Sequence, residues 1–192
     1  GKGALKRKVG VRKRRRPLLI FWEGQKTEPQ NLDALKRETS VRDVAAVDLR
    51  VETGHGGSVP LTLVSMAVQA RKRAIKEKGE IDEFWCVFDV EWPINHPGLA
   101  NALDQARQNS IEVAVSNPCF ELWLALHFQD QGGWLDTDEA QRLRRSHDGE
   151  PDKGVDGARY MPLRGDAVRR AAELDKWHRG NNSLFPDNNP SS

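Results

Sequence analysis

The sequence predicts an α/β fold with a mostly parallel central sheet of about four strands and helices on both faces. One pattern along the chain supports this class. Short apolar runs of strand length alternate four times with longer segments of helical character between residues 17 and 128. Repeated strand–helix units with right-handed crossovers build a parallel sheet that helices cover on both sides. The amphipathic segments after residue 130 then predict a C-terminal helical extension.

The four predicted strands are short, and each is followed by a helical segment. The first, "PLLIFW", begins with Pro17, a residue that is tolerated at the first position of a strand. A continuous apolar run of this length is typical of a strand that is buried on both faces. The predicted strands span residues 17–22, 45–52, 83–89 and 111–116.

The first two predicted helices have recognisable start signals. In the segment 27–38, Thr27 and Gln30 have the spacing of a capping box. In the next helix, which runs to residue 78, Ser58 can act as the cap and Pro60 lies in the first turn.

The later helices follow the same rules. Pro97 begins a helix that is predicted to end near residue 109, and Asn117 is predicted to cap an apolar helix over 117–128 with Pro118 at its first position. After residue 130, the pattern predicts helices over residues 139–147 and 164–179.

Charge divides the chain unevenly. Residues 1–16 contain nine basic and no acidic side chains, whereas the rest of the chain has 21 basic and 28 acidic ones. We predict a disordered basic arm over 1–16, an α/β domain over 17–130, and a helical extension with an irregular tail over 131–192 that packs on the same domain. A basic arm suits binding to a polyanion such as nucleic acid, although such a run is equally typical of a solubilising tail.

Localisation is predicted from apolar runs and cysteines. No run approaches the ~20 apolar residues that span a bilayer, and no apolar stretch follows the first basic residues as in a secretory signal. Cys86 and Cys119 lie in apolar segments, which favours reduced thiols over a disulfide. We therefore expect a cytoplasmic protein without membrane contact.

Acidic residues stand where two predicted strands end. Glu23 follows the first strand, while Asp89 and Glu91 end the third, and on an extended segment residues two apart point the same way. Ligands of open parallel sheets bind at the carboxyl ends of the strands. Clustered carboxylates repel unless a cation or a shared proton offsets the charge, and Mg²⁺ prefers such oxygens and bridges to phosphates. The pattern favours phosphoryl-transfer or phosphodiester chemistry, but acids are also common wherever a chain leaves its core.

Two neighbours of these acids extend the candidate site. Gly24 permits a tight turn and a close approach of the backbone to a ligand. Glu121 lies in the first turn of an otherwise apolar helix, where it is either a fourth carboxylate of the site or a helix-end acid paired with an arginine. His127, six residues later, is interpreted as a core histidine.

The motifs resemble a known family. Glu23-Gly24 after one strand and Asp89-x-Glu91 after another resemble the TOPRIM fold of topoisomerases, primases and OLD-type nucleases. More specifically, "EGQKTEP", "FWCVFDVE", "SNPCFELWLALHF" and "NPSS" resemble the RloB family, a TOPRIM-like group linked to restriction loci and abortive phage resistance. The likeness extends over most of residues 17–190.

The resemblance implies roles for these residues. By this resemblance, Glu23 would act as general acid or base, and Asp89 and Glu91 would bind Mg²⁺ or Mn²⁺. From their position at the same sheet edge, Glu23 is also a candidate metal ligand and Glu121 a further catalytic candidate. Glu91 stands where the TOPRIM pattern has a second aspartate, so its carboxylate reaches one methylene further. Basic side chains near the first strand would hold a phosphate backbone, and they are Arg12, Lys13, Arg14, Arg15, Arg16 and Lys26.

The expected function is therefore a Mg²⁺-dependent nuclease that acts on DNA or RNA, with tRNA as one target, in antiphage defence. The resemblance also implies a separate AAA- or ABC-type ATPase as partner, since this chain has no Walker motif, and an oligomer is possible. The alternative is a non-catalytic module that binds nucleic acid or a partner and works with that ATPase.

Overall fold

The structure, a computed structural model, describes residues 17–23, 27–39, 48–53, 59–79, 81, 83–150 and 154–192. The predicted basic arm lies outside the described residues, as do Gly24, Lys26 and Ser58.

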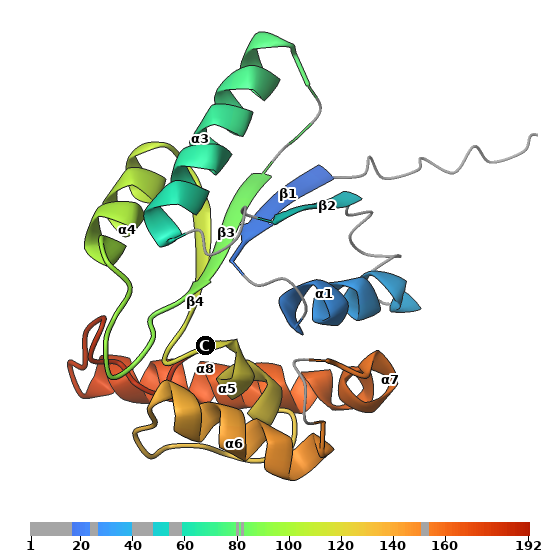
Figure 1. Ribbon diagram of the computed structural model, residues 1–192, viewed down its shortest axis with the longest axis vertical. Helices are drawn as coiled ribbons and strands as arrows, with labels where there is room; N and C mark the ends of the chain where they lie inside the picture. The colour runs from blue at the N-terminus through green and yellow to red at the C-terminus, as the bar shows by residue number, and fades with distance from the viewer. Residues whose placement is uncertain are drawn as a thin grey trace, which may run out of the picture.

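The centre of the fold is a parallel sheet with the strand order β2-β1-β3-β4 (Figure 1). Each neighbouring pair is parallel, so all strands end at one edge, which is called the carboxyl edge below. The strands are β1 (Pro17–Trp22), β2 (Asp48–Thr53), β3 (Glu83–Asp89) and β4 (Glu112–Ser116).

Helices cover both faces of this sheet (Figure 1). Apolar side chains of β1 point alternately to the two faces, so both faces must be covered. Leu19 and Phe21 pack into the larger core with α3 (Pro60–Lys76) and α4 (Leu99–Gln108) on one face. Ile20 and Trp22 form a smaller cluster on the other face, where α1 (Thr27–Arg37) lies. The prediction of an α/β fold with a parallel sheet is confirmed.

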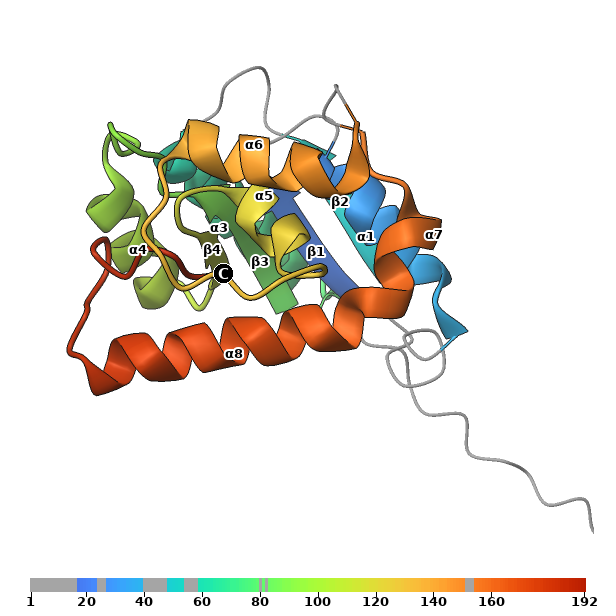
Figure 2. The same cartoon turned by 90° about the horizontal axis from the view of Figure 1, so that it is seen from below.

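The C-terminal half places further helices below the carboxyl edge (Figures 1 and 2). When the molecule is seen from below, α5 lies in front of the strand ends, with α6 and α8 on either side of it. These elements are α5 (Phe120–Ala125), α6 (Thr137–Asp148), α7 (Gly157–Tyr160), the 3-10 turn η1 (Met161–Leu163) and α8 (Arg164–Gly180). The predicted boundaries at residues 16 and 130 stay predictions.

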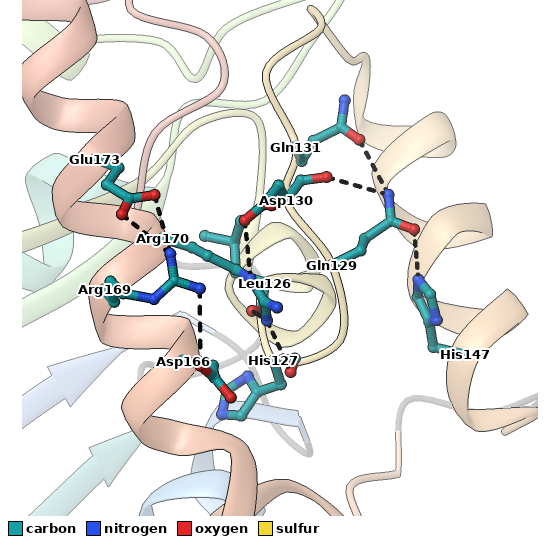
Figure 3. A network of polar contacts seen from close by, with 10 residues as sticks. All are labelled: Leu126, His127, Gln129, Asp130, Gln131, His147, Asp166, Arg169, Arg170 and Glu173. Atoms are coloured by element: carbon teal, nitrogen blue, oxygen red, sulfur yellow. Dashed lines mark hydrogen bonds and ion pairs between the residues drawn. The ribbon is translucent and has the colours of Figure 1, made fainter.

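Arg170 attaches α8 to the end of α5 (Figure 3). Its Nη1 donates to the carbonyl oxygens of Leu126 at 2.8 Å and His127 at 3.1 Å, and its Nε pairs with Asp130 at 2.9 Å. The last carbonyl groups of a helix have no partner within the helix. A side chain from α8 therefore supplies the partners that α5 lacks.

The predicted start signals had mixed outcomes. Pro60 lies in the first turn of α3 as predicted, but the N-cap is Val59 rather than Ser58, and it makes no side-chain cap hydrogen bond. Gln30 Oε1 accepts a hydrogen bond from Val155 N at 2.7 Å, so its amide oxygen holds the C-terminal segment. A capping box not predicted from the sequence begins α6, where Asp136 and Glu139 exchange side-chain to backbone bonds.

The prediction that Asn117 caps a helix over 117–128 is wrong. The helix α5 is shorter, and its N-cap is Cys119 without a side-chain cap bond. The Asn117 side chain is fully buried and bonds instead to Trp92 Nε1, Pro186 O and Asn188 Oδ1. Its backbone also forms an isolated bridge with Ser191. Long-range partners for its amide outweigh the local cap that the sequence suggested.

Candidate active site

The carboxyl edge brings four acidic residues together. Glu23 follows β1, Asp89 ends β3, Glu91 lies two residues further on, and Glu121 lies in the first turn of α5. Burial raises the pKa of Glu91, and the charges of Glu23 and Glu121 raise it further. Burial likewise raises the pKa of the Cys119 thiol, with added contributions from Glu121, Asp89 and Glu91. Glu91 therefore lies within electrostatic range of Glu23 and Glu121, and Asp89 lies within electrostatic range of Cys119.

Glu23 has one paired and one unpaired carboxylate oxygen. Oε1 lies 3.0 Å from Nε2 of His96, whereas Oε2 is buried without a hydrogen-bond partner. Phe21 and Trp22, immediately before it, are completely buried and fix the strand end. An unpartnered buried carboxylate oxygen is costly unless a proton or a cation approaches it. Oε2 is thus the Glu23 oxygen that is available to bind a proton or a cation.

His96 is a site residue that sequence analysis missed. It lies in the loop between β3 and α4, and its backbone N–H donates to Val90 O at 3.1 Å. The adjacent Glu23 carboxylate raises the pKa of His96, and this effect outweighs the opposing effect of burial. The sequence signal was weak, since a single histidine after an acidic strand end specifies no partner.

The prediction that Asp89 and Glu91 point the same way along one extended segment is wrong. The strand β3 ends at Asp89, and Glu91 has φ = 66°, in the left-handed region. Glu91 N donates to Pro118 O at 2.8 Å, which turns the chain away from an extended path. The alternation that would place Asp89 and Glu91 on one face therefore stops before Glu91, because the backbone bonds to the segment after β4.

The Glu91 carboxylate is held by the start of α6. Thr137 Oγ1 donates to Glu91 Oε2 at 2.5 Å and accepts from Trp92 N at 3.0 Å. The Thr137 bond and the charge of His96 lower the pKa of Glu91, but burial has the larger effect. One hydroxyl thus joins the acidic group to the helical extension.

Glu121 is buried, with 7% of its surface exposed, and lies close enough to Cys119 to raise the pKa of that thiol, which donates to Thr137 O at 3.9 Å. Within the parts of the chain that the structure describes, no lysine or arginine pairs with Glu121. The arginine-paired alternative therefore gains no support, and the charge of Glu121 acts on Glu91.

The types of side chain at the site suit a metal ion, but their spacing does not. Carboxylate oxygens, including the unpartnered Glu23 Oε2, are the ligands that Mg²⁺ prefers. Among the described residues, however, no three His, Cys, Asp or Glu side chains are grouped closely enough to hold a metal ion. The residues fit Mg²⁺ in kind, while contacts with His96 and Thr137 hold two of the carboxylates in place.

The remaining predicted residues are only partly described. Gly24, Lys26 and the basic residues 12–16 lie outside the described residues. Thr27 is buried at the first position of α1, and His127 is 2% exposed, which confirms it as a core histidine. None of the helices in the described parts of the chain has the length and apolar character needed to cross a membrane.

Fold and site together define an α/β protein with a carboxylate cluster at the carboxyl edge of a parallel sheet. The family model described as RloB-like protein matches residues 18–192, which is most of the chain. The chain belongs to the RloB-like family, and the resemblance of its motifs is confirmed. No curated protein and no solved structure matches the chain significantly.

Proposed function

We propose that this protein is a Mg²⁺-dependent nuclease with a TOPRIM-like domain. The observation that supports the proposal is that Glu23, Asp89, Glu91 and Glu121 all stand at the carboxyl edge of the sheet, with Glu23 Oε2 buried and unpartnered. Such a cluster is stable when a cation or protons offset its charge. The family match agrees with the proposal without establishing an activity.

Each residue of the site has a role in this proposal. When bound by Asp89, Glu91 and Glu23, Mg²⁺ would polarise a phosphodiester oxygen and stabilise the leaving oxyanion. Glu23 takes up or donates a proton at Oε2, since His96 is paired with Oε1 and orients the carboxylate. Thr137 holds Glu91 through one oxygen and leaves its other oxygen as a ligand.

Glu121 adds negative charge beside Glu91 from a buried position. A buried carboxylate without a basic partner favours a nearby cation, so Glu121 strengthens the binding of Mg²⁺ at the edge. Residues 12–16 and Lys26 would contribute contacts to phosphates.

The alternative is a non-catalytic module that binds nucleic acid or a partner. Two observations favour it, namely the lack of a grouped metal-ligand set among the described residues and the left-handed Glu91 that is fixed by Thr137. In either case, the resemblance suggests a role in antiphage defence and a separate ATPase as partner, and the two buried free cysteines suggest a cytoplasmic location.

Calorimetric titration with Mg²⁺ and Mn²⁺ separates the two functions. The nuclease predicts metal binding that Asp89→Asn and Glu121→Gln weaken, and that the exposed Asp104→Asn on α4 leaves unchanged. Wild type should cleave single-stranded or duplex DNA, tRNA or mRNA when Mg²⁺ is present. Glu23→Gln should reduce cleavage by about 10²–10⁴-fold, the usual contribution of a general acid or base.

Two results would overturn the proposal. Cleavage that survives Glu23→Ala and Asp89→Ala together would exclude the assigned mechanism. Metal binding that is absent, or that does not depend on Asp89 and Glu91, would favour the binding module.

A further inference from the structure

Trp134 exposes a large aromatic ring close to the acidic edge. It lies in the loop before α6, and 55% of its surface is exposed. Its ring makes an edge contact with Trp92, with centroids 5.8 Å apart and an interplanar angle of 73°. An edge contact between two rings uses at most one face of each. At least one face of Trp134 is therefore not covered by Trp92.

Trp92 is rigidly held and follows Glu91 directly in the chain. Its Nε1 donates to the buried Asn117 Oδ1 at 2.7 Å, and its carbonyl oxygen accepts from Thr137 N at 3.2 Å. Its own N–H donates to Thr137 Oγ1, the hydroxyl that also bonds to Glu91. Trp92 is thus fixed relative to the proposed catalytic carboxylates, and the ring of Trp134 lies against it.

We propose that Trp134 stacks against an unpaired base of the substrate and so selects single-stranded or looped nucleic acid. This inference rests on the proposed nuclease function, whose substrate class it narrows. Every base has a π-face, so stacking on an aromatic ring binds DNA and RNA with little sequence preference. In a duplex the neighbouring base pairs cover those faces, and an exposed ring then has nothing to stack on.

The chain offers a matched control. Trp177 on α8 is 56% exposed, nearly the same fraction as Trp134, and its ring contacts the neighbouring His178. The ring contact described for Trp177 is with His178, whereas that of Trp134 is with Trp92, so Trp177→Ala removes a comparable aromatic surface that does not belong to the Trp92–Trp134 pair.

The test measures binding without cleavage. Fluorescein-labelled oligo(dT), oligo(rU) and a duplex of the same length are titrated with each variant in EDTA, and fluorescence anisotropy reports the dissociation constant. Trp134→Ala should weaken binding of both single strands by about 5- to 150-fold, the range for loss of one stacked base. Trp134→Phe should restore most of the affinity, while Trp177→Ala should match the wild type. The duplex should bind equally to all variants.

Several outcomes would overturn the inference. The first is that Trp134→Ala and Trp177→Ala weaken binding equally, and the second is that Trp134→Ala weakens binding of the duplex as much as that of the single strands. The third is that the wild type binds no oligonucleotide, which would favour a protein partner for this ring. Urea unfolding of each variant shows whether the fold is kept, and Trp134→Phe serves if Trp134→Ala does not fold. The nuclease proposal fails separately, when Mg²⁺ supports no cleavage although Trp134 still governs binding.

Discussion

Substituting Asn117 should destabilise the protein far more than removing a helix cap would. In Asn117→Ala, three hydrogen bonds are lost, namely those to Trp92 Nε1 at 2.7 Å, Pro186 O at 2.7 Å and Asn188 Oδ1 at 3.1 Å. Each hydrogen bond contributes a net ~0.5–1.5 kcal/mol, and Asn117 is completely buried, so water does not replace the lost partners. We expect the free energy of unfolding to fall by about 2–4 kcal/mol.

Asn117→Asp distinguishes the buried hub from a helix cap. Aspartate is as good a cap as asparagine, so a capping role predicts almost no change. In the observed structure, aspartate keeps the acceptor for Trp92 but loses the Nδ2 donor and places a carboxylate against two acceptor oxygens. We therefore expect Asn117→Asp to be at least as destabilising as Asn117→Ala.

Urea unfolding followed by tryptophan fluorescence measures both changes. The control is Asn181→Ala, which removes one exposed local bond to Trp177 O and should change stability by less than about 0.5 kcal/mol. A loss below about 0.5 kcal/mol for Asn117→Ala, or wild-type stability for Asn117→Asp, would refute the role of Asn117 as a hub.

Three further predictions concern packing and buried polar groups. Tyr160→Phe removes the hydroxyl that donates to the buried Asp148 carboxylate at 2.5 Å, and should lower the free energy of unfolding by about 1.5–3 kcal/mol in urea. Gly157→Ala places a Cβ 2.4 Å from the Cβ of Ala34, so it should cost about 1–3 kcal/mol by overpacking α7 against α1, again measured in urea. Burial lowers the pKa of His127 below its usual value near 6.5, so the unfolded state binds the proton more readily. The stability that a neutral His127 provides is therefore complete above about pH 6.5, and it is lost as the pH falls toward the folded-state pKa. Thermal unfolding of wild type and His127→Asn across this pH range measures the effect. The wild type should lose more stability toward acid than the variant does.

Each of these three predictions has a control or a result that would contradict it. Gly165→Ala on α8 meets nothing within 4 Å and should be neutral or stabilising, so equal effects at Gly157 and Gly165 would contradict the packing argument. Wild-type stability in Tyr160→Phe would mean that the Asp148 carboxylate does not need this donor. Parallel pH profiles for wild type and His127→Asn would show that His127 has the same pKa in both states.

The sequence predicted the sheet well because buried parallel strands need continuous apolar runs. "PLLIFW" and "EFWCVFD" are such runs, and they match β1 and β3 residue for residue. Glu23 and Asp89 were identified for the same reason, since a charge marks the end of a buried strand. The carboxyl edge of the site was thus predictable from local patterns.

Other features depend on partners far away in the chain. Asn117 resembled a cap because its partners Pro186 and Asn188 lie about seventy residues later, and no local pattern announces them. His96 could not be assigned, because its pairing with Glu23 spans two strands. The capping box of Asp136 and Glu139, in contrast, has a local signature and could have been found.

The bonds between Asn117 and residues 186–191 have a consequence for biosynthesis. All four carboxylates are made by the time residue 121 has been translated, but the chain that supports Asn117 includes Pro186, Asn188 and Ser191. A ribosome-bound chain that has reached residue 180 therefore carries the complete acidic cluster without the segment that fixes Asn117, and through it Trp92. Asn117 gains these partners only when residues 186–191 have emerged from the ribosome and docked against it.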